Sequence, residues 1–231
     1  MFRKILDLFH RDSLLNQALK DSYVMLDVDR EMFVESIKSL RKQDNSELKI
    51  DIRKKDLMIN EYEREVRKKV LTHLSISGKA DITPGLVLTS IIIDIERIGD
   101  YTKNIVELSL NHPTRLEGSI FEEELVKIEE ILVNIFDQLI DAFKNSKIQI
   151  AREIMENSSE ITRKCDKWVS MLIKGEGTPQ VPTDAICLAL YIRYLKRICA
   201  HLRNIATSIV NPFHRIGYRE KSKSNLKSEH K

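Results

Sequence analysis

Residues 91–105 place charged side chains and a glycine within a stretch that is otherwise apolar, Ile-Ile-Ile-Asp-Ile-Glu-Arg-Ile-Gly-Asp-Tyr-Thr-Lys-Asn-Ile. In a helix, Glu96, Asp100 and Asn104 would lie on one face because they are four residues apart. Gly99 lies within about one turn of them, and a glycine inside a helix costs about 0.5–1 kcal/mol relative to alanine. This cost indicates that Gly99 has a packing or functional role, in which a second backbone or an ion comes close.

The segment 83–110 recurs at 183–210 when the sequence is shifted by 100 residues, without a gap. The identical pairs are Thr83 and Thr183, Leu88 and Leu188, Ile92 and Ile192, Arg97 and Arg197, Ile98 and Ile198, Asn104 and Asn204, and Ile105 and Ile205. Other pairs, such as Leu86 and Ile186, keep their apolar character. The pattern indicates an internal repeat of roughly 100 residues in which an equivalent helix closes each half.

The composition predicts an all-α fold, since only 7 of the 231 residues are glycine and 5 are proline. Apolar periodicity and turn signals predict six helices. Their expected ranges are 13–43, 47–73, 83–110, 119–145, 147–174 and 183–210. The expected starting signals of the third, fourth and sixth helices are Thr83 with Pro84, Ser119 with Glu122, and Thr183 with Asp184. Short links between antiparallel neighbours favour two tandem three-helix bundles, packed side by side into an elongated six-helix protein.

These helices divide the chain into four parts. Residues 13–111 and 119–211 form the two repeats, and a short link joins them. Residues 1–12 form an amphipathic segment with basic neighbours, which either docks on the bundle or rests on a membrane surface. Residues 212–231 form a polar tail that has little apolar surface to bury, and we expect it to be disordered.

The charge balance excludes nucleic acid as the main ligand, because 38 Lys and Arg residues face 35 Asp and Glu residues. Cys165, Cys187 and Cys199 are odd in number and lack the spacing of a metal site. They indicate reduced core thiols of a cytoplasmic protein. No stretch of 18 uninterrupted apolar residues predicts a membrane span.

The pattern Glu-Arg-Ile-Gly-Asp at 96–100, followed by Asn104 and Ile105, lies on the last helix of a three-helix unit that occurs twice. It resembles the PhoU family of phosphate-signalling regulators over about residues 14–211. Aliphatic and acidic residues that alternate in the preceding helix support the resemblance, namely Ile59, Tyr62, Glu63, Glu65 and Val66. The resemblance implies the same repeated bundle fold. The motif residues that it marks are Arg97, Gly99 and Asn104 in the first repeat and Arg197 and Asn204 in the second.

The resemblance also implies a metal site, because acidic motifs of the second and third helices in this family are associated with iron or zinc clusters. The matching positions are Glu63, Asp94, Glu96 and Asp100. Carboxylates on adjacent helices suit such cations because several negative oxygens converge. The alternative is an ion-pair network in which Arg97 and Lys103 neutralise these acids on a solvated face. Tyr101 stands where many relatives have a histidine, which removes one possible ligand.

The second repeat has lost these acids. Lys196, Cys199 and Ala200 stand where the first repeat has Glu96, Gly99 and Asp100, so any iron or zinc cluster is expected in the first repeat only. Basic residues of the sixth helix instead form a stripe that could dock an acidic partner or simply face solvent. These residues are Arg193, Lys196, Arg197 and Arg203, with His201 beside them as a structural or surface histidine.

No catalytic signature occurs in the sequence: it lacks a phosphate-binding loop, a nucleophile elbow, a His-Glu-x-x-His motif and the Glu-x-x-His pairs of a di-iron bundle. We therefore expect a regulator rather than an enzyme. The resemblance implies control of phosphate uptake and of the phosphate-starvation response. The implied partners are a phosphate transporter, either an ABC importer or a sodium–phosphate symporter, and/or a sensor histidine kinase. A homodimer is expected, with peripheral membrane association through its partner. The alternative is a metal-binding bundle, holding iron or zinc, with a storage or redox role.

Overall fold

The computed structural model describes residues 13–43, 48–112 and 114–220, and these contain six long helices and no strand. The helices are α2 (Leu14–Arg41), α3 (Ile52–Ile76), α4 (Ile82–Asn111), α5 (Glu122–Asn145), α6 (Ile148–Ile173) and α7 (Pro182–Val210). Three short 3-10 turns, η1 (Lys79–Asp81), η2 (Ser119–Phe121) and η3 (Phe213–Arg215), lie next to helix ends. The all-α prediction is confirmed.

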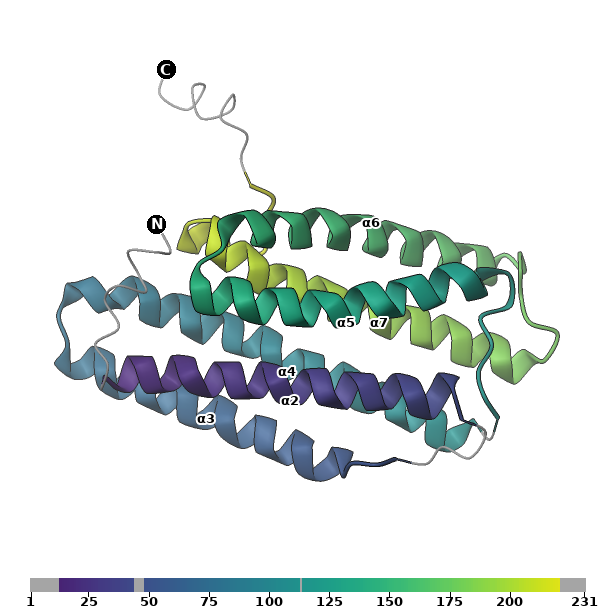
Figure 1. Cartoon of the computed structure of the whole chain (residues 1–231), viewed down its shortest axis with the longest axis horizontal. Coiled ribbons are helices and arrows are strands. Elements are labelled where there is room, and N and C mark those ends of the chain that lie inside the picture. Colours follow the sequence, from purple (N-terminus) through teal and green to yellow (C-terminus); the bar gives the residue numbers. More distant parts are fainter. Residues whose placement is uncertain (1–12, 44–47, 113, 221–231) are drawn as a thin grey trace, which may run out of the picture.

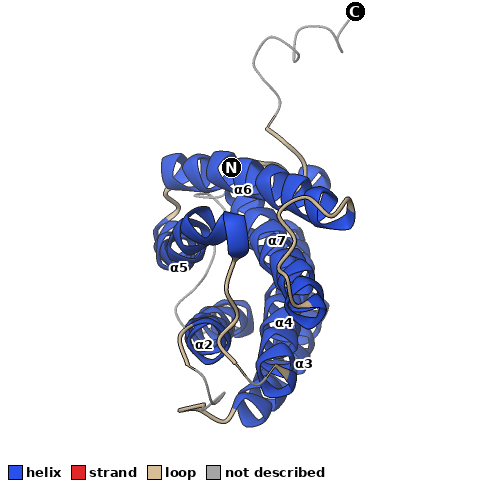
Figure 2. Cartoon of the chain, turned by 90° about the vertical axis from the view of Figure 1, so that its right-hand side faces the viewer, coloured by secondary structure: helices blue, strands red, loops and turns tan. Residues whose placement is uncertain are grey.

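The six helices form two bundles of three, which lie side by side along their length (Figure 1). Helices α2, α3 and α4 pack against one another in the first repeat, and α5, α6 and α7 do so in the second. Figure 2, which views the protein end-on, shows α4 beside α7 and α2 beside α5 where the bundles meet. The two repeats therefore share one continuous core, and the predicted elongated arrangement is confirmed.

The helix starts differ from the expected ones. Ser13 caps α2 as predicted, because its hydroxyl accepts a hydrogen bond from the amide of Asn16 at 3.1 Å. No side-chain cap forms at the starts of α4, α5 and α7, and 3-10 turns lead into α4 and α5 instead. Two of the expected side chains make long-range contacts: Glu122 binds Arg41 and also accepts a hydrogen bond from the amide of Gly118, and Asp184 binds His112 at 2.9 Å.

Apolar side chains fill the space where the bundles meet. Phe33 of α2 and Phe136 of α5 are fully buried, and their ring centroids lie 5.5 Å apart. The link between the repeats is also fixed, because the amide of Leu116 donates to the carbonyl of Leu40 at 2.9 Å. Such contacts across the repeats stabilise a single body rather than two separate ones.

The chain after α7 turns back onto the second bundle instead of leaving it. Asn211 donates from its side-chain amide to the carbonyls of Arg215 and Tyr218, at 3.1 and 2.7 Å. The predicted disorder of the tail therefore does not apply to residues 212–220. Residues 1–12 and 221–231, which include the amphipathic segment and the rest of the tail, lie outside the described part. Among the described helices, none is both long and apolar enough to cross a bilayer.

Candidate functional site

Five carboxylate side chains gather where α2, α3 and α4 meet beside Gly99. They belong to Asp29, Asp56, Glu63, Glu96 and Asp100. Gly99 lets Asp29 come close to α4, since a Cβ atom added to this glycine would lie 3.0 Å from both the Oδ1 atom of Asp29 and the Cδ1 atom of Ile59. The sequence predicted that a second backbone or an ion comes close to this glycine, whereas the groups that do so are a buried carboxyl group and an isoleucine side chain.

Asp29 is the most unusual member of the cluster. It is 0% exposed, and neither of its carboxylate oxygens has a hydrogen-bond partner among the described residues. Burial raises the pKa of Asp29 well above its usual range, and the negative charges of Glu96, Asp56 and Asp100 raise it further. A carboxyl group in such surroundings favours the protonated form.

Basic side chains pair with the other members. The Nζ atom of Lys103 lies 3.1 Å from Asp56 and 3.2 Å from Asp100, and Arg97 lies 3.0 Å from Asp100. Arg67 pairs with Glu63 at 2.7 Å. These pairs match the alternative to a metal site that the sequence left open, an ion-pair network in which Arg97 and Lys103 neutralise the acids.

Glu96 has weaker compensation, because its contact with Arg97 is 3.6 Å long. Burial raises the pKa of Glu96, followed by the charge of Asp100, whereas Arg97 lowers it. Burial alone would lower the pKa of Lys103, but its hydrogen bonds to Asp56 and Asp100 raise it overall. The cluster thus contains one carboxyl group that favours its protonated form, Asp29. The carboxylates around it form ion pairs with basic side chains.

The expected metal ligands are only partly brought together. Glu63, Glu96 and Asp100 belong to the cluster, whereas Asp94 points toward α7. Within the part of the chain that the structure describes, no group of three or more His, Cys, Asp and Glu side chains has the arrangement of a metal site. The carboxylates are close enough to affect one another's pKa, but their oxygens do not converge as ligands in this arrangement.

Asp94 lies at the seam between α4 and α7. Its Oδ1 atom lies 2.7 Å from Nδ1 of His201 and accepts a hydrogen bond from the side-chain amide of Asn204 at 3.1 Å. The ring of Tyr101 stacks on that of His201 at 5.8 Å and contacts that of Tyr194 at 6.0 Å. Later residues of α4 thus meet earlier residues of α7, so these two helices run antiparallel.

The seam follows the internal repeat. Tyr101 and His201 occupy equivalent positions, 100 residues apart, and they contact each other. The equivalents of Asp94 and His201 in the other repeat are Tyr194 and Tyr101. These two residues are also in contact, as Asp94 and His201 are. The repeats are therefore related by an approximate two-fold axis that passes through this stack.

The four basic residues expected on the last helix do not form one stripe. The Nε atom of Arg197 donates to the hydroxyl of Tyr101 at 3.0 Å, and the side chain of Arg193 is 53% exposed. Arg193 also lies 3.8 Å from Asp166 of α6, and the same carboxylate pairs with Lys196. Arg203 lines a cleft beside α6. Of the four, Arg193 and Arg197 are the two with exposed side chains next to the seam, and Arg193 shares Asp166 with Lys196.

A buried hydrogen-bond network joins the repeats, and the sequence patterns did not reveal it. The guanidinium of Arg41 contacts the carboxylates of Glu129 and Glu122 at 2.9 and 2.8 Å and also the carbonyl of Leu116. The hydroxyl of Tyr191 donates to Glu129 at 2.8 Å. The side chains of Arg41 and Glu129 are only 2% and 6% exposed, so the network fixes α2, α5, α7 and the link in one arrangement.

We expect the unpartnered carboxyl group to make stability depend on pH, and Asp29→Asn tests this. Because the pKa of Asp29 is raised in the folded state, folding retains a proton that the unfolded chain releases above about pH 3.9. The stability that this retention contributes is fully present below that pH and is lost as the pH rises through the folded-state pKa. The Asp29→Asn variant should therefore gain stability relative to the parent protein as the pH rises from about 4 to about 8.

Urea unfolding at several pH values, in the presence of a chelator, measures this difference. Asp27→Asn is the matched control, since Asp27 is exposed on the same helix. A difference between the Asp29→Asn variant and the parent protein that stays constant with pH would contradict the assignment of a protonated Asp29.

The family follows from the sequence of both bundles. Residues 23–109 and 125–209 each match the PhoU domain, one match in each three-helix unit. The chain belongs to the PhoU family. The family is regulatory and non-enzymatic, and membership implies a role in the regulation of phosphate transport.

Solved PhoU structures share this fold. PhoU from Pseudomonas aeruginosa is 20% identical, with 85% of this chain and 95% of that chain covered and a TM-score of 0.76. The phosphate transport system regulatory protein PhoU from Streptococcus pneumoniae is 18% identical, with 85% and 93% covered and a TM-score of 0.70. No curated protein sequence matches the chain. At these identities the structural likeness concerns the fold alone.

The PhoU fold places the motif residues of both repeats at their expected helices, but sequence reasoning missed Asp29 and Asp56. Asp29 could have been found, because it lies three or four residues from Met25, Leu26, Met32 and Phe33 and so belongs to the apolar face of α2. A charged residue on the apolar face of a predicted helix indicates a buried polar group, and the sequence of α2 contains this signal.

Proposed function

We propose that this PhoU-family chain controls phosphate uptake and the phosphate-starvation response by contacting other proteins. The partner is a phosphate transporter component, of an ABC importer or a sodium–phosphate symporter, and/or a sensor histidine kinase. The observation that carries the proposal is the pair of PhoU domain matches, which together span most of the described chain. Such a regulator would act in the cytoplasm, as a homodimer, with peripheral membrane association through its partner.

The exposed surface along the seam is the best candidate for the contact. Arg193 and Arg197 of α7 lie there, and the side chain of Arg97 on α4 is 54% exposed. The guanidinium of Arg197 is held over the ring of Tyr101, with its Cζ atom 5.5 Å from the ring centroid. Exposed, oriented arginines of this kind suit an acidic partner surface, because charge complementarity speeds association and fixes orientation.

Deletion of the gene is expected to change phosphate uptake, measured with labelled phosphate at high and at low external phosphate. The double variant Arg193→Glu/Arg197→Glu should fail to restore normal uptake and should retain less of the transporter or kinase in a pull-down from phosphate-replete and phosphate-starved cells. Reversal of two rim charges should weaken the contact about tenfold or more.

Arg53→Glu/Arg64→Glu is the matched control, because it reverses two exposed arginines on α3. It should behave like the parent protein. Unchanged uptake in the deletion strain at both phosphate levels would count against the proposed function, and equal losses in both double variants would count against the proposed surface.

A metal-binding bundle, with iron or zinc in the first repeat and a storage or redox role, is the second candidate. The observation that favours it is Asp29, a fully buried carboxylate without a partner beside Glu96, Asp100 and Asp56. The ion pairs of Lys103 and Arg97 compete with such a site. Metal analysis after purification from iron-rich and zinc-rich media distinguishes the two. Several irons per chain that react with oxygen would favour storage, and none, or one inert cluster, would favour the regulator.

A further inference from the structure

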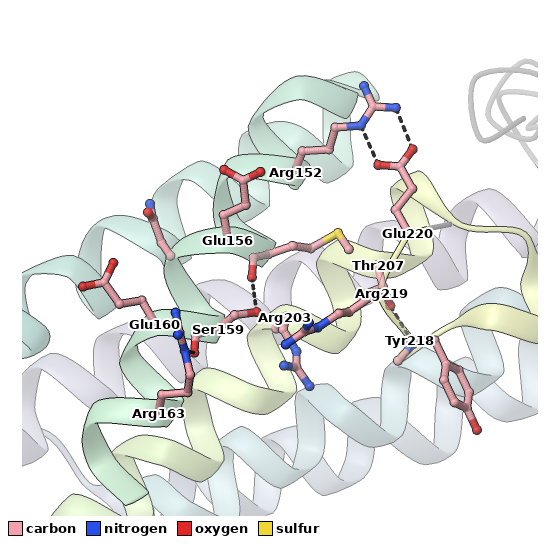
Figure 3. Close-up of a pocket in the computed structure, with 13 residues that line it drawn as sticks. Arg152, Glu156, Ser159, Glu160, Arg163, Arg203, Thr207, Tyr218, Arg219 and Glu220 are labelled. Atoms are coloured by element: carbon pink, nitrogen blue, oxygen red, sulfur yellow. Dashed lines mark hydrogen bonds and ion pairs between the residues drawn. The ribbon is translucent and has the colours of Figure 1, made fainter. Parts of the chain in front are cut away.

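A cleft of about 930 Å³ lies on the second repeat, between α6, the end of α7 and the segment 217–220 (Figure 3). It lies apart from the acidic cluster of the first repeat. Its volume is in the range of pockets that hold small organic molecules, about 300–1,000 Å³, and is far larger than a single inorganic ion needs. Neither the acidic cluster nor the seam explains it.

The walls of the cleft are held in place by the returning chain. Arg152 of α6 and Glu220 form a two-pronged ion pair, with both N–O distances 2.8 Å. The amide of Gly217 donates to the hydroxyl of Thr207 on α7 at 2.7 Å. The φ angle of Gly217 is +86°, which favours glycine at this turn. The cleft is thus preformed, so a ligand would lose little free energy in ordering it.

Three arginines of the cleft have no ion pair with any carboxylate in the described part of the chain. They are Arg163 of α6, Arg203 of α7 and Arg219 of the returning segment. In Figure 3 the guanidinium groups of Arg203 and Arg219 point toward the same part of the cleft. Like charges held together without a counter-charge repel one another, so an anion between them would be stabilised.

The acids of the cleft compensate this charge only in part. Glu220 is engaged by Arg152, and Glu160 lies 3.3 Å from Lys164. Of the lining acids this leaves Glu156 against three arginines. The lining of the cleft therefore favours a ligand with several negative charges.

We propose that this cleft binds a small ligand that carries a chain of phosphoryl groups, supplied either by a nucleotide or by an inorganic oligophosphate. Planar guanidinium groups donate paired hydrogen bonds to phosphate oxygens. Three of them match a chain of phosphates better than they match one carboxylate. The ring of Tyr218 points away from these arginines (Figure 3), and the guanidinium of Arg215 covers one face of it, with its Cζ atom 5.7 Å from the ring centroid, so recognition rests on the arginines alone. The site is independent of the proposed contact with a transporter or kinase.

Isothermal titration calorimetry of the full chain with sodium tripolyphosphate and with ATP, at near-physiological salt, tests the proposal. We expect saturable binding of one molecule per chain. Arg203→Gln should weaken it about tenfold or more, since a hydrogen bond to a charged group contributes about 1.5–3 kcal/mol. The triple variant Arg163→Gln/Arg203→Gln/Arg219→Gln should abolish it. Tighter binding of ATP would assign the nucleotide, and equal binding would assign the phosphate chain alone.

The triple variant Arg53→Gln/Arg64→Gln/Lys68→Gln is the matched control, because it removes three exposed positive charges from α3. Its binding should equal that of the parent protein. Circular dichroism and thermal melting confirm that each variant is folded, and Arg203→Lys, which keeps the charge but loses the paired donors, should bind more weakly than the parent. No saturable binding of either phosphate probe, equal losses in the two triple variants, or tighter binding of hexaglutamate than of tripolyphosphate would overturn the proposal.

Discussion

Replacement of Arg41 by alanine is expected to lower the free energy of unfolding by about 3–5 kcal/mol, because it breaks a buried ion pair from one side. The Arg41 guanidinium donates to Glu129, Glu122 and the carbonyl of Leu116. Its loss would leave Glu129 buried without a counter-charge beside Tyr191. Against a typical total stability of about 5–15 kcal/mol, this loss would remove a large part.

Urea unfolding, followed by circular dichroism, measures the loss. The control is Arg30→Ala, which removes another arginine that pairs α2 with α5, through Asp137. That pair is 36% and 54% exposed, and its loss should cost only about 0–1 kcal/mol. When Glu129→Gln is added to the Arg41→Ala variant, part of the lost stability should return because the uncompensated charge is removed. Equal effects of Arg41→Ala and Arg30→Ala would contradict the importance of the buried network.

Replacement of Gly99 by leucine is expected to destabilise the first repeat by at least about 1–3 kcal/mol, through overpacking. Even the first carbon of a side chain would lie 3.0 Å from Oδ1 of Asp29 and 3.0 Å from Cδ1 of Ile59. The remaining carbons of leucine have no room unless α4 moves away from α2 and α3. The gain in helix propensity, about 1 kcal/mol, offsets only part of this cost.

Thermal melting measures the effect, with Glu107→Leu on the exposed face of the same helix as the control. The second substitution Ile59→Ala should make room for the leucine, so the double variant should lose less stability than the sum of the two single losses. A melting temperature that Gly99→Leu leaves unchanged would mean that this glycine does not set the distance between the helices.

The repeated three-helix architecture could be predicted from the sequence because it rests on local signals. Apolar periodicity places each helix, and the offset of 100 residues pairs 83–110 with 183–210. The starts of α4, α5 and α7 could not be predicted as well. Glu122 and Asp184 resemble capping residues, but their partners, Arg41 and His112, lie more than 70 residues away in the sequence. The local signals for a helix start do not show such long-range contacts, and Glu122 combines its own with a hydrogen bond from the amide of Gly118.

The acidic cluster could be predicted only in part for the same reason. Glu96 and Asp100 share a helix face, whereas Asp94 lies six residues before Asp100, which is about 240° around the helix. Helical spacing alone therefore separates Asp94 from the other two acids. Nothing in the sequence indicates that His201 and Asn204 of α7 would form hydrogen bonds with Asp94. Asp29 joins from a third helix, and its contribution depends on how closely Gly99 allows α2 and α4 to pack.

The stack of Tyr101 on His201 has a consequence for how the halves of the molecule can differ. In a complex of two identical single-bundle subunits, the same side chain would have to meet its own copy on the symmetry axis. A covalent tandem removes this restriction, so a tyrosine can face a histidine there, and Asp94 can meet a histidine while its counterpart Tyr194 meets an aromatic ring. Joining the halves in one polypeptide thus frees one to keep acids and the other to carry arginines.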